Sequence, residues 1–375
     1  MHSKRILLMY ISEVSGHRNA AMAVEKAFKI ICPKAEILNI NALNYTNPVS
    51  EKIVNSIYMS IIKRIPSVWD YLYDNSRIAK KVRKLQESVH RINAPKLRKL
   101  FDNFKPDVVV CSQAFPCSMV AAYKMRYDYS VPLVAVLTDF VPHLYWVHEG
   151  VDYYVTASAE VDKRLCSRGV PLSRIKQFGI PFDPKFSIPV DRQKVISQLG
   201  LARGKQNILV MGGGQGLGPI KAIVKSLDNI DHDFQVMVIT GVNKKLYKQL
   251  LTFSKRLKKK IHLFEFVNNV NELMAISDII VSKPGGITTA EALSLGLPMA
   301  IIKPIPGQEA NNAEYLLKEK AAVKIDSPES AGKIVGDLLA DSRKLKLLSD
   351  NARRISKPSA SMDIAGLLLD LCGKK

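Results

Sequence analysis

The chain has 375 residues, of which 47% are hydrophobic and 24% are charged, and this composition excludes a disordered or fibrous protein. Its length suits two ordinary α/β domains better than one core, and no run approaches the ~20 consecutive apolar residues of a membrane span. The formal net charge of +21 predicts an anionic partner: a lipid surface, a nucleic acid or a phosphorylated ligand.

The first half of the sequence repeats a strand–loop–helix pattern. Residues 5–11 form a continuous apolar run typical of a buried parallel strand, and a small-residue turn and a helical pattern over 19–31 follow it. Further strands are predicted at 106–111, 132–137 and 152–156. Strands that alternate with helices predict a parallel sheet with helices on both faces.

A proline-containing connector after Gly179 interrupts this rhythm, and a second series of strands then begins. We therefore predict one Rossmann-like domain over residues 1–178 and another over 179–357. Residues 358–375 carry apolar side chains at helical spacing, which predicts a terminal helix packed on a domain surface. The strands expected in the second series are 207–211, 234–240, 261–265, 279–282 and 298–302.

A glycine-rich turn follows the first strand of the second series, in the sequence Met211-Gly-Gly-Gly-Gln-Gly-Leu-Gly-Pro219. Such a turn brings bare backbone amides close to a phosphate, with a helix start beside it. Its glycine spacing fits neither the Rossmann fingerprint nor the P-loop, which disfavours dehydrogenases and ATPases. An ordinary tight strand-to-helix turn is the alternative.

A second glycine pair lies in Ser282-Lys-Pro-Gly-Gly-Ile-Thr-Thr-Ala-Glu-Ala-Leu293. Hydroxyls and free amides in a first helical turn suit a diphosphate, and the lysine adds positive charge. Glu291 is placed either to accept hydrogen bonds from a ribose or to cap the helix. The following amide-rich loop, 303–312, suits sugar hydroxyls, with helix capping by Gln308 or Asn311 as the alternative.

His17 follows the first strand in Ser15-Gly-His-Arg18, where the carboxyl ends of parallel strands form a ligand crevice. A neutral imidazole there can accept a proton from a hydroxyl, although a loop histidine is commonly just solvated. Thr138 and Asp139 follow another strand end at the same crevice, and Asp139 either orients a histidine or caps a loop. The five scattered cysteines contain no C-x-x-C pair, and no clustered ligand spacing predicts a metal site.

Residues 53–105 combine an apolar helical stripe with many lysines and arginines. A basic amphipathic region with interfacial aromatics is typical of binding to an anionic bilayer. The alternative is that the stripe packs on the core while the cations are solvated.

The motifs Ser-Gly-His17, Gly-Gly-Gly214, Lys-Pro-Gly-Gly-Ile-Thr-Thr-x-Glu291 and Pro-Gly-Gln-Glu-x-x-Asn312 together resemble the monogalactosyldiacylglycerol synthase and processive diacylglycerol glucosyltransferase family. That family is MurG-like and belongs to glycosyltransferase family 28. The resemblance implies a GT-B fold, in which two Rossmann-like, doubly wound domains face each other across a cleft. The N-terminal domain would bind acceptor and membrane, the C-terminal domain the UDP-sugar, and the final helix would cross back to the first domain.

The implied reaction is inverting transfer of a hexose from a UDP-sugar to diacylglycerol or a glycosyl-diacylglycerol, without a metal or other cofactor. The enzyme would work in the cytoplasm, as a peripheral protein on the inner face of the cell membrane. Two alternatives stay open: MurG-like transfer of GlcNAc to a polyprenyl-diphosphate lipid, and a non-catalytic protein of this fold that binds anionic lipid. Nucleic acid is not expected as a partner, because the aromatics lie mainly on the apolar stripe.

The resemblance and the patterns above also imply a role for each site residue. His17 is the candidate base, with Asp139 beside it in the catalytic set. The loop before this histidine, 12–16, lacks the glycine run of many relatives. In the donor set, the Phe266 and Val267 backbone would meet uracil, Glu291 the ribose, and Gln308, Glu309 and Asn312 the sugar. The whole donor set is Gly212, Gly213, Gly214, Phe266, Val267, Lys283, Gly285, Gly286, Thr288, Thr289, Glu291, Gln308, Glu309 and Asn312. The acceptor and membrane set is Ser15, Gly16, His143, Trp146, Lys63, Arg64, Trp69, Lys80, Lys81, Arg83 and Lys84.

Overall fold

The computed structural model describes residues 3–12, 15–46, 93–141, 144–302, 304 and 307–373. The chain divides into two compact units, and each is described by itself. The first contains Met1–Pro184, Pro306–Gln308 and Ser359–Lys375, and the second contains Lys185–Ile305 and Glu309–Pro358. Each unit holds a six-stranded parallel sheet with helices on its faces, which confirms the prediction of two doubly wound α/β domains.

The sheet of the first unit has the strand order β2-β1-β3-β4-β5-β6, and all its strand pairs are parallel. Its strands are β1 (Arg5–Tyr10), β2 (Glu36–Asn41), β3 (Val108–Cys111), β4 (Leu133–Val136), β5 (Tyr153–Val155) and β6 (Ile175–Lys176). Its helices are α1 (Gly16–Ile31), α2 (Ala42–Thr46), residues 93–104, α6 (Ala114–Tyr127), η1 (Leu144–Trp146), α7 (Ala159–Cys166), η2 (Leu172–Arg174) and α16 (Ala360–Leu371).

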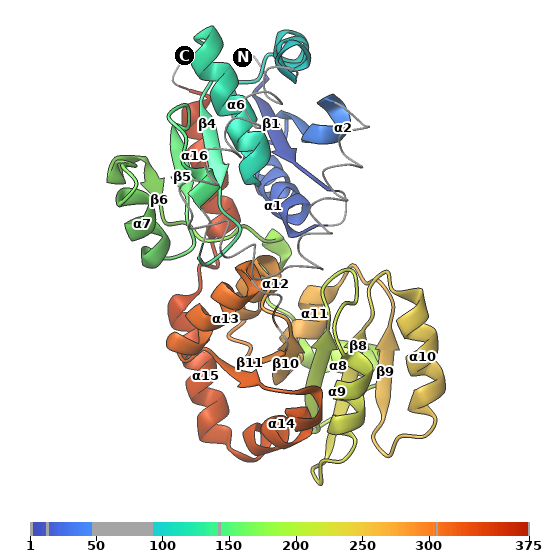
Figure 1. Cartoon of the computed structure of the whole chain (residues 1–375). Helices are drawn as coiled ribbons and strands as arrows, with labels where there is room; N and C mark the ends of the chain where they lie inside the picture. Colours follow the sequence, from blue (N-terminus) through green and yellow to red (C-terminus); the bar gives the residue numbers. More distant parts are fainter. Residues whose placement is uncertain are drawn as a thin grey trace. The chain divides into compact units, whose positions relative to one another are not determined.

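The central strands of this sheet are buried on both faces, as continuous apolar runs in a parallel sheet require. One face is covered by α1 and by the C-terminal helix α16, whose Ile364, Ala365 and Leu368 are fully buried. The other face is covered by α6 and the helix over 93–104. The last helix of the chain is therefore part of the first unit, as its colour shows in Figure 1.

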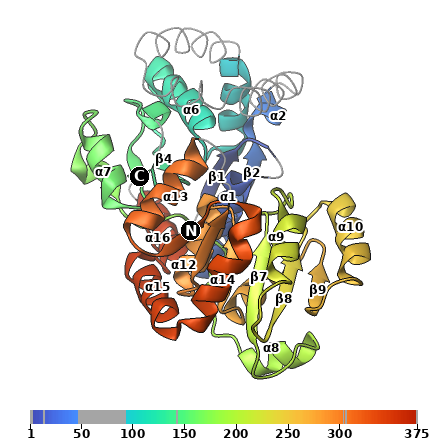
Figure 2. The same cartoon turned by 60° about the horizontal axis from the view of Figure 1, so that its bottom comes forward.

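The sheet of the second unit has the order β12-β11-β10-β7-β8-β9, also all parallel. Its strands are β7 (Gln206–Met211), β8 (Phe234–Ile239), β9 (Ile261–Phe264), β10 (Ile279–Ser282), β11 (Met299–Ile302) and β12 (Ala322–Ile325). Its helices are η3 (Pro184–Ser187), α8 (Arg192–Gln198), α9 (Ile220–Leu227), α10 (Lys244–Ser254), α11 (Val270–Ala275), α12 (Gly286–Ser294), α13 (Gln308–Lys318), η4 (Pro328–Ser330), α14 (Ala331–Ala340) and α15 (Ser342–Ile355). Helices α9, α10 and α14 share a core with one face of this sheet, and Figure 2 shows α9 and α14 beside its strands.

Each sheet has one point where the order of strand addition reverses. In the first unit it lies between β1 and β3, and in the second it lies between β7 and β10. The loops that leave such neighbouring strands run to opposite faces of the sheet, so a crevice opens at their carboxyl ends, where ligands of α/β proteins bind. Both predicted glycine turns and His17 follow strands at these two points.

Candidate active site

His17 lies in the first turn of α1, directly after the loop that follows β1. We predicted this helix from residue 19, but it begins at Gly16, because the Ser15 side chain accepts a hydrogen bond of 3.2 Å from the Arg18 amide. A serine N-cap satisfies a backbone donor that would otherwise lack a partner. The candidate base is therefore held on a rigid element.

The loop before α1 contains a residue in the left-handed region, Ser12, with φ of 72°. Its carbonyl accepts a hydrogen bond of 2.9 Å from the Ser15 hydroxyl. Glycine adopts this conformation without the steric cost that other residues bear, about 1 kcal/mol or more. Where many relatives have a run of glycines, this loop therefore has a residue in a strained backbone conformation, five positions before the candidate base.

The His17 ring is fixed by the two neighbouring strand ends. Its Nδ1 atom lies 2.9 Å from the carbonyl oxygen of Ser112, after β3, and 2.9 Å from Oγ1 of Thr138, after β4. The Ser112 hydroxyl in turn donates to the His17 carbonyl at 2.8 Å. A carbonyl only accepts hydrogen bonds, so Nδ1 carries the hydrogen and the lone pair of the neutral ring is on Nε2.

Burial lowers the pKa of His17 from its usual 6.5 to about 4, against a smaller opposing effect of the hydrogen bond to Ser112. The imidazole is therefore neutral at pH 7. With its hydrogen fixed on Nδ1, the ring presents Nε2 as a proton acceptor.

Sequence analysis missed Ser112, and it placed Thr138 with Asp139 at the same crevice without a contact to His17. The signal for both was their position after strands: Ser112 follows β3, at the switch point, and Thr138 follows β4, the next strand of the sheet. Asp139, predicted to assist His17, directly follows Thr138 and is 7% exposed. The group that reaches His17 Nδ1 is the hydroxyl of Thr138, and the catalytic role of Asp139 stays a prediction.

The predicted acceptor and membrane set is only partly described. Ser15 is the cap of α1 and Gly16 its first residue. Trp146 is 1% exposed within the hydrophobic core of the first unit, so the prediction that it contacts acceptor or membrane is wrong. Large apolar side chains are buried more often than they are exposed, and this favours a place in the core for the Trp146 ring. The other members lie outside the described residues: His143, Lys63, Arg64, Trp69, Lys80, Lys81, Arg83 and Lys84.

The first glycine turn of the second unit closes on itself. The Gly216 amide donates to the Gly213 carbonyl, and the Leu217 amide donates to the Gly212 carbonyl, both at 3.0 Å. A Cβ on Gly212 would lie 2.0 Å from the Leu217 carbonyl oxygen, and Gly213 has φ of 68°. The turn itself therefore requires these two glycines.

Gly214 differs from its two neighbours. A Cβ there would meet nothing within 4 Å, and its φ is not positive. The fold does not need glycine at this position. Bare backbone at such a point leaves room for a ligand to approach closely.

The second glycine turn presents the start of α12. Gly285 is its N-cap and supplies no side-chain hydrogen bond, and a Cβ on Gly285 would meet nothing within 4 Å. The Thr289 amide donates to the Gly285 carbonyl at 2.9 Å. The earlier amides of the first turn, at 286–288, have no acceptor within a helix. An uncapped helix start of this kind is suited to an anion.

Thr288 and Thr289, both predicted to hold a diphosphate, differ in their exposure. Its side chain is fully buried, and its amide already donates to Gly285. Successive helical residues point about 100° apart, so two consecutive threonines face different surroundings. Thr288 is partly exposed whereas Thr289 is buried, and the roles of both in holding a diphosphate stay predictions.

Helix α13 brings two further predicted residues to this turn. Glu309 Oε1 lies 2.9 Å from Lys283 Nζ, and both side chains are largely buried. Asn312 Nδ2 donates to the Pro284 carbonyl at 3.1 Å. Asn312 is 1% exposed, and its contact with the transferred sugar stays a prediction.

The remaining donor residues also follow the carboxyl ends of strands in the second sheet. Glu291 is partly exposed on α12, and Gln308 is the first residue of α13. Phe266 and Val267 follow β9, the edge strand, which is separated from β7 by β8. Phe266 is 62% exposed. Their contacts with ribose, sugar and uracil stay predictions.

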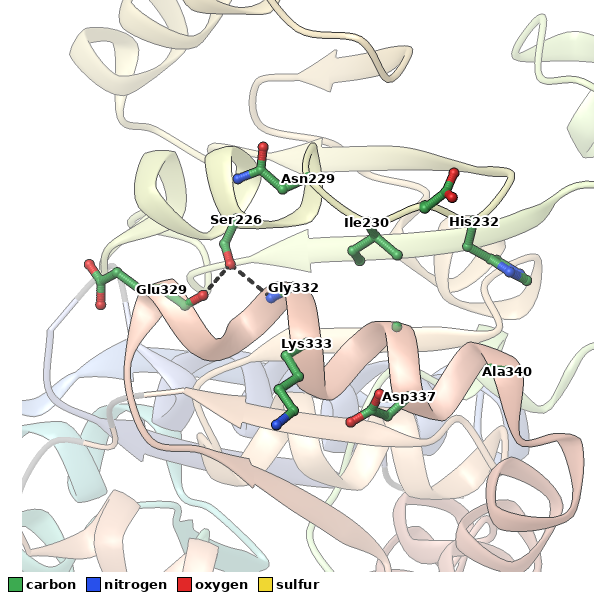
Figure 3. A pocket seen from close by; sticks show the side chains of 11 residues that line it. Ser226, Asn229, Ile230, His232, Glu329, Gly332, Lys333, Asp337 and Ala340 are labelled. Atoms are coloured by element: carbon green, nitrogen blue, oxygen red, sulfur yellow. Dashed lines mark hydrogen bonds between the residues drawn. The ribbon is translucent and has the colours of Figure 1, made fainter.

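A pocket of about 420 Å³ lies between α9 and α14 in the second unit (Figure 3). Ser226 Oγ accepts from the Gly332 amide at 2.8 Å and donates to the Glu329 carbonyl at 2.6 Å. The pocket borders the connection from α9 into β8, so it lies at the amino ends of the strands, opposite the glycine turns. Within the described ranges, no group of three or more His, Cys, Asp or Glu side chains is placed to hold a metal ion.

Comparison with known proteins gives full-length matches. The processive diacylglycerol β-glucosyltransferase of Bacillus cytotoxicus is 29% identical over 376 residues, which cover 98% of this chain and 93% of the relative. Among solved structures, Acinetobacter baumannii MurG matches with a TM-score of 0.63 at 15% identity, covering 98% of this chain and 99% of that one. Anabaena HepE in complex with UDP-glucose matches with a TM-score of 0.55 at 14% identity, covering 98% of each chain. These structural matches show the GT-B fold.

Two family profiles match the two halves of the sequence in turn. The monogalactosyldiacylglycerol (MGDG) synthase profile matches residues 17–182, which include His17, Ser112 and Thr138. The profile of the glycosyltransferase family 28 C-terminal domain matches residues 207–365, which include both glycine turns. The chain therefore belongs to the MGDG synthase family of glycosyltransferases, with a family 28 C-terminal domain.

Proposed function

We propose that this glycosyltransferase moves a hexosyl group from a UDP-sugar to a diacylglycerol-type lipid. The observation that carries the proposal is the uncapped start of α12 at the β7/β10 switch point, with Lys283 beside it. A glycine-lined helix start with a nearby cation suits a diphosphate. The names of the full-length relatives, processive diacylglycerol β-glucosyltransferases, support the acceptor and the sugar class.

In this proposal the second unit holds the donor. The amides of residues 286–288 and the Thr288 hydroxyl bind the diphosphate, and Lys283 supplies positive charge. Glu291 accepts hydrogen bonds from the ribose, the backbone at Phe266 and Val267 meets uracil, and Gln308 and Glu309 bind the sugar. Because these groups are placed before the reaction, they stabilise the charge that develops on the leaving UDP.

The first unit supplies the base. An acceptor hydroxyl attacks the anomeric carbon, its proton passes to His17 Nε2, and the bond from that carbon to UDP breaks, which inverts the anomeric configuration. A base with a pKa of about 4 is weaker than free imidazole. We therefore place proton transfer late, as the new carbon–oxygen bond forms and the hydroxyl becomes acidic.

The direct test uses the purified full chain with UDP-glucose or UDP-galactose and vesicles that contain diacylglycerol. Release of UDP together with a lipid product heavier by one hexose supports the proposal. Absence of turnover with every common UDP-sugar and lipid would contradict it. A polyprenyl-diphosphate lipid is the competing acceptor, and a strict requirement for it would replace diacylglycerol in the proposal.

We also propose that no metal or other cofactor takes part, because backbone amides and Lys283 can meet the charge of the leaving UDP. Turnover in excess EDTA should equal turnover without it. Activity that requires added Mg²⁺ or Mn²⁺ would show that the amides do not suffice.

We place the enzyme at the inner face of the cell membrane, as a peripheral protein. None of the helices in the described ranges combines enough length and apolar character to span a bilayer. Among the described residues, the segment 243–260, on α10 and the turn after it, contains eight lysines and arginines and no acidic residue. Leu251 on the same helix is 48% exposed. Cations around an exposed apolar side chain suit an anionic bilayer surface.

The membrane proposal has its own test, independent of turnover. Sedimentation with vesicles should show binding to phosphatidylglycerol mixtures and weak binding to pure phosphatidylcholine, with binding reduced by salt. Lys244→Glu combined with Lys248→Glu should reduce binding if α10 contacts the lipid. Equal binding to both vesicle types would contradict an electrostatic membrane contact.

A further inference from the structure

Asn312 was expected to meet the transferred sugar, but its side chain lies beneath the donor turn. It is 1% exposed, and its Nδ2 donates to the Pro284 carbonyl at 3.1 Å. Glu309 lies three residues earlier on α13 and contacts the preceding residue of the turn, Lys283. Residues three apart share a helix face, so one face of α13 contacts two consecutive residues of the turn, Lys283 and Pro284.

The three successive carbonyls of this turn each have a hydrogen-bond partner, and one of these partners is a side chain of α13. The Lys283 carbonyl accepts from the Gly285 amide at 3.0 Å, and the Gly285 carbonyl accepts from the Thr289 amide at 2.9 Å. Between them, the Pro284 carbonyl accepts from the Asn312 side chain. Proline has no amide hydrogen of its own, and Pro284 is buried. A buried carbonyl needs a partner, and here a side chain from another helix supplies it.

We propose that Asn312 is a positioning residue for the diphosphate: it fixes the Lys283–Gly285 turn and thereby aims the first amides of α12. This proposal rests on the proposed function, because it takes UDP as the ligand of α12. It assigns Asn312 to the nucleotide part of the donor and not to the sugar. Without its amide, the Pro284 carbonyl loses its partner, the turn relaxes, and the amides at 286–288 no longer converge on one phosphate.

The two roles separate in a binding experiment with and without the sugar. Titration calorimetry on the full chain would compare UDP with UDP-glucose for the wild type, Asn312→Ala and Asn312→Asp. A positioning role predicts that each variant weakens the binding of UDP and of UDP-glucose by the same factor. For the alanine variant this factor should be roughly tenfold. The aspartate variant should weaken both further, because a carboxylate facing a carbonyl has no hydrogen to donate.

Asn311→Ala and Asn311→Asp are the matched controls, since Asn311 is the preceding, partly exposed residue of the same helix. They should leave both affinities unchanged. Circular dichroism melting and the fitted stoichiometry report the folded fraction, and loss of folded protein alone leaves the dissociation constant unchanged. If the aspartate variant does not fold, Asn312→Ser, which retains a short donor, takes its place and should weaken UDP less than the alanine variant does.

Unchanged UDP affinity with weakened UDP-glucose affinity would overturn the proposal, because it is the signature of a sugar contact. Unchanged affinity for both ligands would also overturn it. Absence of binding of either ligand to the wild type is a different result, because it contradicts the proposed UDP-sugar donor and not the role of Asn312.

Discussion

The two units place their predicted chemistry at the same topological position but present it differently. At the β1/β3 switch point of the first unit, the group in place is a side chain, the His17 ring, fixed by Ser112 and Thr138. At the β7/β10 switch point of the second unit, backbone is presented at two turns, with Gly214 and Gly285 free of steric neighbours on the Cβ side. A proton acceptor must be a side chain, whereas a diphosphate is well held by amides.

This difference predicts two kinds of mutational sensitivity. In the first unit, loss of one side chain removes a reactive group and leaves the fold intact. In the second unit, the damaging change is the addition of a Cβ to a glycine, because the backbone itself is proposed to contact the ligand.

The largest expected effect is that of His17→Ala. If Nε2 accepts the acceptor's proton, kcat should fall by roughly 10²–10⁴-fold, the usual contribution of a general base. The affinity for UDP should be unchanged, because the donor groups lie on the other unit. Steady-state kinetics and UDP calorimetry on the same preparation measure both quantities. Retention of full kcat would remove His17 from the mechanism.

Gly212→Ala and Gly214→Ala should separate the glycines required by the fold from one required by a ligand. A Cβ on Gly212 would lie 2.0 Å from a backbone oxygen, so we expect the free energy of unfolding to fall by about 3 kcal/mol. Gly214→Ala should change stability by less than about 0.5 kcal/mol, because nothing lies within 4 Å of the added atom. Its effect should be on UDP affinity. Urea unfolding and calorimetry measure the two effects, and a stable Gly214→Ala protein with normal UDP affinity would exclude close approach of the ligand there.

Acidification provides a test confined to His17. Its pKa is about 4 in the folded chain and about 6.5 when unfolded, so the unfolded state takes up the proton first as the pH falls. The free energy of unfolding should therefore decrease between pH 6.5 and pH 4, by at most about 3 kcal/mol from this residue. His17→Gln should lack this component, and the difference between the two urea-unfolding curves against pH isolates it. Parallel curves would show that the ring is not desolvated.

The sequence predicted the parts of this molecule that depend on local pattern. Buried strands such as β1 and β7 are continuous apolar runs, and the glycine turns after β7 and β10 are visible as spacing. The sequence analysis missed β2, β6 and β12, because β2 and β12 are half-exposed edge strands that mix polar and apolar residues and β6 has only two residues. A short or half-exposed strand gives little periodicity.

Within the site, the motifs located the turns but not the direction of each side chain. Thr288 and Thr289 are adjacent in sequence, yet only Thr288 is partly exposed. Asn312 belongs to a recognisable motif, but its burial depends on how α13 packs against the β10–α12 turn. Ser112 and Thr138 are far from His17 in sequence, so only the parallel pairing of β1, β3 and β4 brings them to the ring.

The smallest effect should come from Thr138→Val, which removes the hydroxyl beside His17 Nδ1 and keeps the shape of the side chain. The Ser112 carbonyl would still hold the ring, so we expect kcat to fall by only about tenfold, with KM for the UDP-sugar unchanged. Thr138→Ser, which restores a hydroxyl, should recover most of the loss. Because the hydroxyl contacts the base and not the substrate, the acidic limb of the kcat–pH profile should shift in the valine variant. A fall in kcat with an unshifted profile, or no recovery by serine, would indicate that Thr138 acts through packing alone.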